Sequence, residues 1–172
     1  MSKIEYDLTR VKAFVFDIDG VLSPATVPID EDGIPMRMTN IRDGYAFRRA
    51  VKSGYPIAII TGGTSEIVIK RFNILGIKDV FIGVKYKKPV LEQWMLDNGL
   101  TRDEVAYMGD DIPDLVCMRA VGLACAPYDA AWEVLATARF VSKYSGGYGC
   151  ARDLMEQVMR SKGEWPKLDE IV

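Results

Sequence analysis

FVFDIDGVLS, residues 14–23, places Asp17 and Asp19 two positions apart at the end of an apolar run and follows them at once with Gly20. A continuous apolar run of this length is typical of a strand that is buried on both faces. The two carboxylates are therefore expected where a buried strand ends. In an open parallel sheet, ligands bind at the carboxyl ends of the strands. The stretch thus predicts both a parallel sheet and a polar site at its edge.

The same pattern recurs along the chain, with short apolar runs alternating with segments of helical periodicity. This alternation predicts an α/β fold, a Rossmann-like parallel sheet with helices on both faces. A chain of 172 residues is long enough for one domain with a full core, so we expect a single domain over residues 1–172. The expected strands lie at 11–17, 56–61, 79–84, 104–110, 121–126 and 139–142, and the expected helices at 43–53, 64–75, 88–98, 112–120, 129–136 and 149–162.

Residues 25–40, with the sequence ATVPIDEDGIPMRMTN, interrupt this alternation. Two extended pieces flank the turn signal Asp32-Gly33, and the segment has no helical period. We therefore expect a β-hairpin that projects from the sheet directly after the paired aspartates.

Composition excludes several classes of function. The net charge of -2 provides no positive field for nucleic acid. No apolar run has the length of a membrane span or the character of a secretion signal, so a cytoplasmic location without a membrane partner is expected. The three cysteines are widely spaced, which predicts reduced packing residues. Histidine is absent, so histidine bases and histidine-ligated metals are excluded, and catalysis must use carboxylates, lysines or hydroxyls.

Polar residues follow four of the expected strands, and the carboxyl ends of parallel strands meet at one edge of a sheet. Each of these motifs alone has a simpler interpretation, as a turn, a helix start or a solvated charge run. Their placement at successive strand ends favours a shared site instead. The residues are Asp17 and Asp19 after the first strand, Thr61, Gly62 and Gly63 after the second, Lys85, Lys87 and Lys88 after the third, and Asp110, Asp111 and Asp114 after the fourth.

Several carboxylates at one edge repel each other unless a cation lies among them. Oxygen ligands without histidine or cysteine favour a hard divalent ion, and a few carboxylates with waters and a substrate phosphate suit Mg²⁺. Asp17 is then a candidate nucleophile, and Asp19 a candidate general acid and base. The groups that can hold phosphate oxygens are the hydroxyl of Thr61, the amides of Gly62 and Gly63, and the ammonium of Lys87.

Four motifs resemble, in the same order, those of the haloacid dehalogenase superfamily, the aspartate-nucleophile phosphatases: DIDGVLS, IITGG, the lysine after FIG, and GDDIPD. The resemblance implies that Asp17 attacks phosphorus to form an aspartyl phosphate. Asp19 would protonate the leaving alcohol and then activate water. The implied Mg²⁺ ligands are the carboxylates of Asp17 and Asp110 and the backbone carbonyl of Asp19.

Two positions in these motifs stay open. Spacing from Gly83 favours Lys87 over Lys88 as the lysine of the third motif. In the fourth motif, either Asp111 or Asp114 would reach the metal through water or orient the lysine.

Most members of the superfamily insert a cap domain between these motifs, and the gaps in this chain are too short to hold one. The chain therefore resembles the capless members, which are tetramers whose projecting hairpins form a central barrel. The resemblance implies a homotetramer in which a neighbouring subunit covers each site and excludes water. The segment 25–40, otherwise an exposed edge, fits that role.

Among the capless members, the chain most resembles the 3-deoxy-D-manno-octulosonate 8-phosphate phosphatases of lipopolysaccharide synthesis. NIRDGYAFRRAVKSGYPIAIITGG matches over a long stretch, and SGGYGCARDLMEQV is similar to a C-terminal GGxGxxR segment that folds over an active site. The resemblance implies a lid at about 144–172. Without it, this segment reads as a plain loop before the last helix. The implied substrate-binding residues are Gly62, Gly63, Arg42, Asp43, Arg71, Gly147 and Arg152, with Arg152 pairing with the carboxylate of a sugar acid.

Two other functions are alternatives. Phosphatases of nine-carbon keto sugar acids typically carry a glutamate directly after the TG of the second motif and a lysine three positions after the arginine that corresponds to Arg71. This chain has Gly63 and Ile74 there, which favours the eight-carbon substrate. Tyr148, where the octulosonate enzymes often have arginine, is a departure in the other direction. A non-catalytic tetramerisation module would show eroded motifs, whereas all four are intact here.

Overall fold

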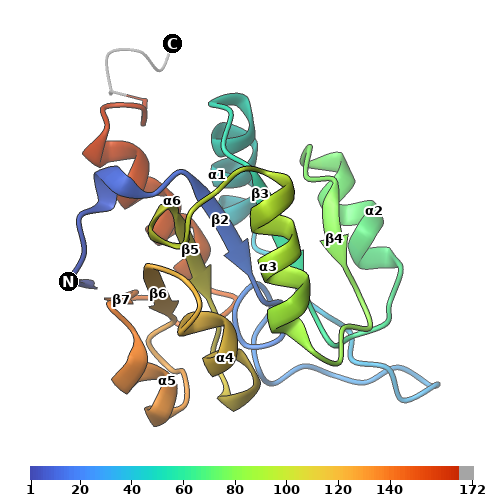
Figure 1. Ribbon diagram of the computed structural model, residues 1–172. Helices are drawn as coiled ribbons and strands as arrows, with labels where there is room; N and C mark the ends of the chain where they lie inside the picture. Colours follow the sequence, from blue (N-terminus) through green and yellow to red (C-terminus); the bar gives the residue numbers. More distant parts are fainter. Residues whose placement is uncertain (167–172) are drawn as a thin grey trace.

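The computed structural model describes residues 1–166, and its centre is a seven-stranded sheet in the order β1-β7-β6-β5-β2-β3-β4 (Figure 1). Neighbouring strands run parallel from β7 to β4, and β1 pairs antiparallel with β7. The α/β fold predicted from the alternating pattern is confirmed. The strands are β1 (Lys3–Ile4), β2 (Ala13–Phe16), β3 (Ile57–Ile60), β4 (Asp79–Phe81), β5 (Val105–Met108), β6 (Leu123–Ala126) and β7 (Phe140–Val141).

A helix lies in each segment where the sequence predicts one. The predicted helix at 112–120 is divided into a 3₁₀ turn, Ile112–Asp114, and a short α-helix. Pro113 lies in the 3₁₀ turn, where its missing N–H costs no hydrogen bond. The helices are α1 (Ile41–Lys52), α2 (Ile67–Ile74), α3 (Lys87–Asp97), α4 (Leu115–Met118), α5 (Trp132–Thr137) and α6 (Cys150–Ser161), and further 3₁₀ turns lie at Leu8–Arg10 and Arg102–Glu104.

Each face of the sheet packs against its own set of helices. On β2, Phe14 and Phe16 pack with residues of α1, α2 and α6, while Ala13 and Val15 pack with residues of α3, α4 and α5. Successive side chains of a strand point to opposite faces. Both faces are therefore buried, which explains the continuous apolar runs and holds the carboxyl ends of the strands in place.

The sequence analysis missed strand β1. Its two residues are exposed, and a run this short carries no period. Backbone hydrogen bonding continues beyond β1, since Glu5 N donates to Arg139 O at 2.7 Å. The edge strand is therefore set by tertiary contact with β7.

The segment 25–40 projects from the carboxyl edge of the sheet (Figure 1). Ile29 and Pro35 form one antiparallel bridge. Oδ1 of Asp30 holds the turn by accepting the backbone N–H groups of Asp32 at 3.0 Å and Ile34 at 2.8 Å. The ladder is a single bridge, in keeping with the marginal stability of an isolated two-stranded hairpin.

The segment predicted as a lid, 144–172, begins as a loop and continues into α6, and its last residues, 167–172, lie outside the described residues. Gly147 N donates to Val21 O at 2.7 Å, and Nδ2 of Asn40 donates to Gly147 O at 3.1 Å. The loop is thus fixed against the turn that follows Asp19. In residues 1–166, no helix combines the length and hydrophobicity that crossing a membrane would need.

Candidate active site

Strands β2, β3, β4 and β5 end at the same edge of the sheet, and residues that follow β2, β3 and β4 line one cleft. Phe16 at the end of β2 pairs with Ile59 on one side and with Met108 on the other. The cleft measures about 660 Å³. Its lining includes the residues predicted at three strand ends, namely Asp17, Asp19, Thr61, Gly62, Gly63, Lys85, Lys87 and Lys88.

Lys87 is the lysine that contacts the carboxylates. Its Nζ lies 2.9 Å from Oδ1 of Asp17 and 2.8 Å from Oδ1 of Asp114, and its side chain is 9% exposed. Burial alone would lower the pKa of Lys87, but the two carboxylates hold that pKa above its usual value. Lys88 instead pairs on the surface with Glu92 at 3.3 Å. The structure therefore places Lys87, and not Lys88, beside the candidate nucleophile.

Both oxygens of Asp114 are committed to protein groups. Oδ1 accepts from Lys87 and from the hydroxyl of Tyr107 at 2.7 Å, and Oδ2 accepts from Asp110 N at 3.1 Å. Asp114 thus orients Lys87 and the backbone at Asp110. Asp111 is exposed and accepts from Ile112 N at 2.8 Å, so it lies outside this network. Tyr107 was missed by the sequence analysis, although a buried tyrosine hydroxyl in a strand usually has a partner.

The carboxylates form a cluster that fits a divalent cation. Oxygens of Asp17, Asp110 and Asp114 all lie within 4.8 Å of one another. Burial and the neighbouring Asp17 and Asp114 raise the pKa of Asp110 to about 7, and burial together with Asp114 raises the pKa of Asp17. Negative charge is therefore disfavoured here until a cation compensates it. Gly20, with a φ of +80°, makes room for the cluster, because a Cβ there would stand 1.8 Å from Oδ2 of Asp110.

Asp19 has a partner that the sequence analysis missed. Nε of Arg37 donates to Oδ1 of Asp19 at 2.8 Å, and Nη2 donates to Oδ2 at 2.7 Å. Arg37 belongs to the projecting segment, whose pattern shows no period and so does not indicate which side chains turn inward.

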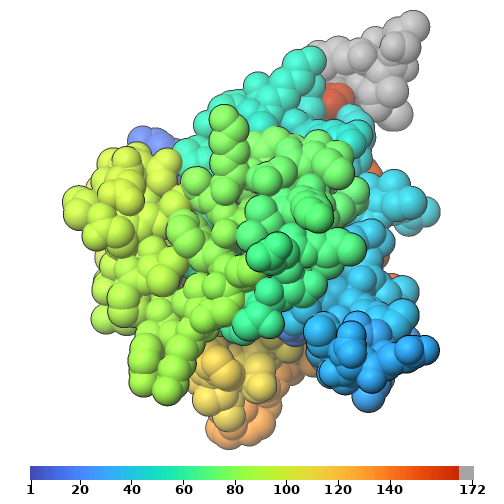
Figure 2. All heavy atoms as spheres, turned by 90° about the vertical axis from the view of Figure 1, so that its right-hand side faces the viewer, coloured from blue at the N-terminus to red at the C-terminus, as the bar shows by residue number. Residues whose placement is uncertain are grey.

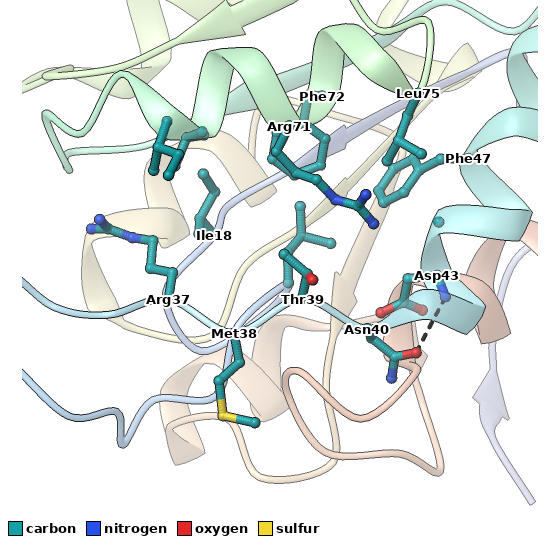
Figure 3. A pocket seen from close by; sticks show the side chains of 14 residues that line it. Ile18, Arg37, Met38, Thr39, Asn40, Asp43, Phe47, Arg71, Phe72 and Leu75 are labelled. Carbon is teal, nitrogen blue, oxygen red and sulfur yellow. Dashed lines mark hydrogen bonds between the residues drawn. The ribbon is translucent and has the colours of Figure 1, made fainter.

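A second cavity of about 250 Å³ lies between α1, α2 and the residues that lead into α1 (Figure 3). Two predicted substrate residues line it, Asp43 and Arg71, and the guanidinium of Arg71 lies against Gly44. Arg37 and Ile18 line it as well, so this cavity adjoins the cleft at Asp19. The rest of its lining is mainly apolar and includes Leu22, Phe47, Val68, Phe72 and Leu75.

Arg42 and Arg152 line a different cleft, together with Tyr148. The guanidinium of Arg152 lies over the rings of Tyr45 and Trp165, and Nε is 3.1 Å from Oε2 of Glu156. Arg152 is thus a packed side chain here rather than a freely solvated one. The structure therefore divides most of the residues predicted to bind substrate among three places: the cleft, the apolar cavity, and the surface around Arg152. Gly147 lies instead in the loop that is held against Val21.

Asp43 is a buried carboxylate with one free oxygen. The residue is 3% exposed, and its Oδ1 accepts from Arg152 N at 2.8 Å, which caps the first turn of α6. Its Oδ2 accepts no hydrogen bond from the residues that the structure describes. Burial raises the pKa of Asp43 to about 6.

We expect Asp43→Asn to stabilise the fold, and more so at high pH. The pKa of Asp43 rises from 3.8 to about 6 on folding, so the wild type loses stability as the pH rises from about 4 to about 6. The amide keeps the acceptor for Arg152 N and removes the buried charge. Urea unfolding should show a gain of about 1–3 kcal/mol at pH 8 and a much smaller one at pH 4.5.

The control is Asp153→Asn. Its Oδ2 accepts from the hydroxyls of Ser2 at 2.6 Å and Ser142 at 2.7 Å, so this variant should not gain stability. An equal gain for Asp43→Asn at both pH values would contradict the assignment.

Known proteins can be compared with this geometry. No protein-family model matches the chain. The 3-deoxy-D-manno-octulosonate 8-phosphate phosphatase KdsC of Escherichia coli (strain B / BL21-DE3) is 32% identical over 170 residues, which cover 99% of this chain and 87% of the relative. This chain belongs to the family of 3-deoxy-D-manno-octulosonate 8-phosphate phosphatases. It is a phosphoric monoester hydrolase of the haloacid dehalogenase superfamily, as the motifs predicted.

Solved structures of the family share the fold of this phosphatase. The enzyme of Moraxella catarrhalis, in complex with magnesium, phosphate and a KDO molecule, superposes with a TM-score of 0.84 at 28% identity, covering 90% of this chain and 88% of the other. The cobalt-bound enzyme of Haemophilus influenzae superposes with a TM-score of 0.86 at 29% identity, covering 91% of each chain. Divalent cations in both structures agree with the predicted metal cofactor.

Proposed function

We propose that this phosphatase hydrolyses 3-deoxy-D-manno-octulosonate 8-phosphate to the free sugar acid and phosphate in lipopolysaccharide inner-core biosynthesis. The observation that carries the proposal is the position of Asp17. Its carboxylate lies at the cleft 2.9 Å from Lys87 Nζ and within 4.8 Å of oxygens of Asp110 and Asp114. The eight-carbon substrate is the one named for the relatives above. The cytoplasmic location expected from the sequence stays a prediction.

In the proposed mechanism, an oxygen of Asp17 attacks phosphorus in line. The new O–P bond forms as the bond to the leaving oxygen breaks, which produces an aspartyl phosphate. Asp19 gives its proton to the leaving oxygen and then takes a proton from the water that hydrolyses the aspartyl phosphate. The hydroxyl of Thr61, the amides of Gly62 and Gly63, and the ammonium of Lys87 hold the phosphate oxygens.

The acidic cluster fits Mg²⁺, which the carboxylates of Asp17 and Asp110 and the backbone carbonyl of Asp19 would hold. When bound, it supplies positive charge that shields the phosphate from the attacking carboxylate. Lys87 and this charge both favour the ionised form of Asp17, which burial disfavours. The mechanism uses Asp17 as a carboxylate, the form that the ammonium of Lys87 stabilises.

The substrate is tested by comparing kcat/KM for octulosonate 8-phosphate, a nonulosonate 9-phosphate and a neutral hexose phosphate at saturating Mg²⁺. We expect the eight-carbon acid to be preferred by at least about tenfold, because Gly63 and Ile74 replace the glutamate and lysine of the nine-carbon enzymes. Preference for the nine-carbon acid would keep the mechanism and change the substrate. If no phosphate is released from any of the three, the tetramerisation module becomes the better account.

We also propose that the protein is a homotetramer in which each active site is covered by a neighbouring subunit, with the lid segment at its rim. The projecting segment and α2 lie on the same face of the molecule (Figure 2), and each carries exposed apolar side chains. A patch of this kind typically marks an interface. Light scattering in solution decides the subunit number. The exposed residues are Ile29, Ile34, Met36 and Met38 on the projecting segment and Ile67 and Ile74 on α2.

A further inference from the structure

The ion pair between Arg37 and Asp19 occupies the carboxylate that the mechanism needs. Both oxygens of Asp19 accept from the guanidinium, at 2.8 and 2.7 Å. The Arg37 side chain is 11% exposed and that of Asp19 is 45% exposed, so the guanidinium is the more buried partner. Two parallel hydrogen bonds from a guanidinium to one carboxylate form a strong and directional contact. Asp19 must leave this contact before it can protonate a leaving oxygen.

Gly63 provides the space that Arg37 fills. A Cβ at position 63 would stand 2.2 Å from Nη2 and 2.9 Å from Cζ of Arg37. The guanidinium thus lies where the side chain of residue 63 would otherwise extend. Arg37 therefore lies between Gly63, in the candidate phosphate-binding turn, and Asp19, the candidate general acid.

Arg37 also lies where the two cavities meet. Asp19 and Gly63 line the cleft with the nucleophile, whereas Arg37 lines the cavity that contains Asp43 and Arg71. Figure 3 shows Arg37 at one end of that cavity and Asp43 at the other. A leaving group that extends from a phosphate at Asp17 toward that cavity passes the guanidinium of Arg37.

We propose that Arg37, rather than Arg152, is the specificity residue for the carboxylate of the leaving sugar acid, and that it exchanges the carboxylate of Asp19 for that carboxylate. This inference rests on the proposed function. One carboxylate replaces another on the guanidinium of Arg37. Asp19 is then released beside the leaving oxygen, where it takes up a proton from solvent and can act as the general acid. A neutral sugar phosphate offers no anion for the exchange, and Asp19 then stays on Arg37. This exchange of carboxylates on Arg37 favours the hydrolysis of phosphate esters of sugar acids over those of neutral sugars.

The test compares Arg37→Met, Arg37→Lys and the wild type on octulosonate 8-phosphate and on glucose 6-phosphate with Mg²⁺. We expect Arg37→Met to lose about 10- to 100-fold in kcat/KM on the sugar acid ester, the range of a lost charged hydrogen bond. On the neutral ester it should lose nothing, so the preference collapses. Arg37→Lys should restore only part of the preference, because lysine lacks the planar fork. Arg10→Met, which removes an exposed ion pair with Asp103, is the matched control and should change neither substrate.

Gly63→Ala provides a second, independent perturbation, because its methyl group displaces Arg37 without removing it. We expect the same loss of preference, and no further loss when Gly63→Ala is added to Arg37→Met. An equal loss on both substrates in Arg37→Met, or additive effects in the double variant, would overturn the exchange even if the wild type prefers the sugar acid. A wild type without that preference would overturn the proposed function and this inference with it.

Discussion

Asp17→Asn is expected to abolish phosphate release, with a fall in kcat of about 10⁴-fold or more, because it removes the nucleophile. The amide has nearly the volume of the carboxylate, and its oxygen can still accept from Lys87, which lies 2.9 Å away. The substitution also removes the charge of a carboxyl group. Burial and the neighbouring Asp114 raise the pKa of that group well above its usual value. The fold should therefore survive, and thermal unfolding in chelator checks this.

The control for this variant is Asp97→Asn, on the exposed face of α3, where the carboxylate accepts only from Gln93 among the interactions found in the described residues. It should keep wild-type turnover within about twofold, as surface substitutions usually change little. Turnover by folded Asp17→Asn at a rate near that of the wild type would contradict covalent attack by Asp17.

We expect the second large loss of turnover from Lys87→Met. Loss of the ammonium removes a cation expected on the phosphate, and kcat should fall by about 10²–10³-fold. It also leaves the buried carboxylates of Asp17 and Asp114 without their common partner, so the melting temperature in chelator should fall. Added Mg²⁺ should recover part of that stability but little of the turnover.

Lys88→Met is the matched comparison, since the two lysines are adjacent in sequence and differ in environment. The ion pair of Lys88 with Glu92 is half-exposed, and such pairs contribute little. A larger loss of turnover in Lys88→Met than in Lys87→Met would reverse the assignment of the motif lysine.

Much of the fold is predictable because local pattern and global packing agree. Strands buried on both faces must be apolar throughout, so β2, β3, β5 and β6 each leave a run that can be recognised in the sequence. Strand β1 leaves none, because its two exposed residues pair through the backbone alone. The turn residues at 32–33 predict a hairpin in the projecting segment, but they do not determine how long its ladder is. The structure shows a single bridge, between Ile29 and Pro35.

The candidate site divides in the same way. Asp17, Thr61 and Lys87 follow strands, so topology alone brings them to one edge. Arg37 comes from a segment without a period, and its contact with Asp19 depends on the path of that segment over Gly63. Nothing local indicates that path.

Asp43 and Arg152 show a further limit of motif reasoning. The resemblance implied that both contact substrate, which stays a prediction, and the structure adds a direct link between them through the backbone N–H of Arg152. A sequence motif indicates that its residues share a function, but it does not show which of their atoms are in contact. The free Oδ2 of Asp43 is visible only in the folded chain.

The most direct test of the central claim is phosphate release from octulosonate 8-phosphate with saturating Mg²⁺ and with excess chelator, using Asp17→Asn as the background. The acidic cluster predicts turnover with Mg²⁺ and release at the background level in chelator. Release that persists undiminished in chelator, or never exceeds the Asp17→Asn background with Mg²⁺, would contradict a metal-dependent aspartate phosphatase.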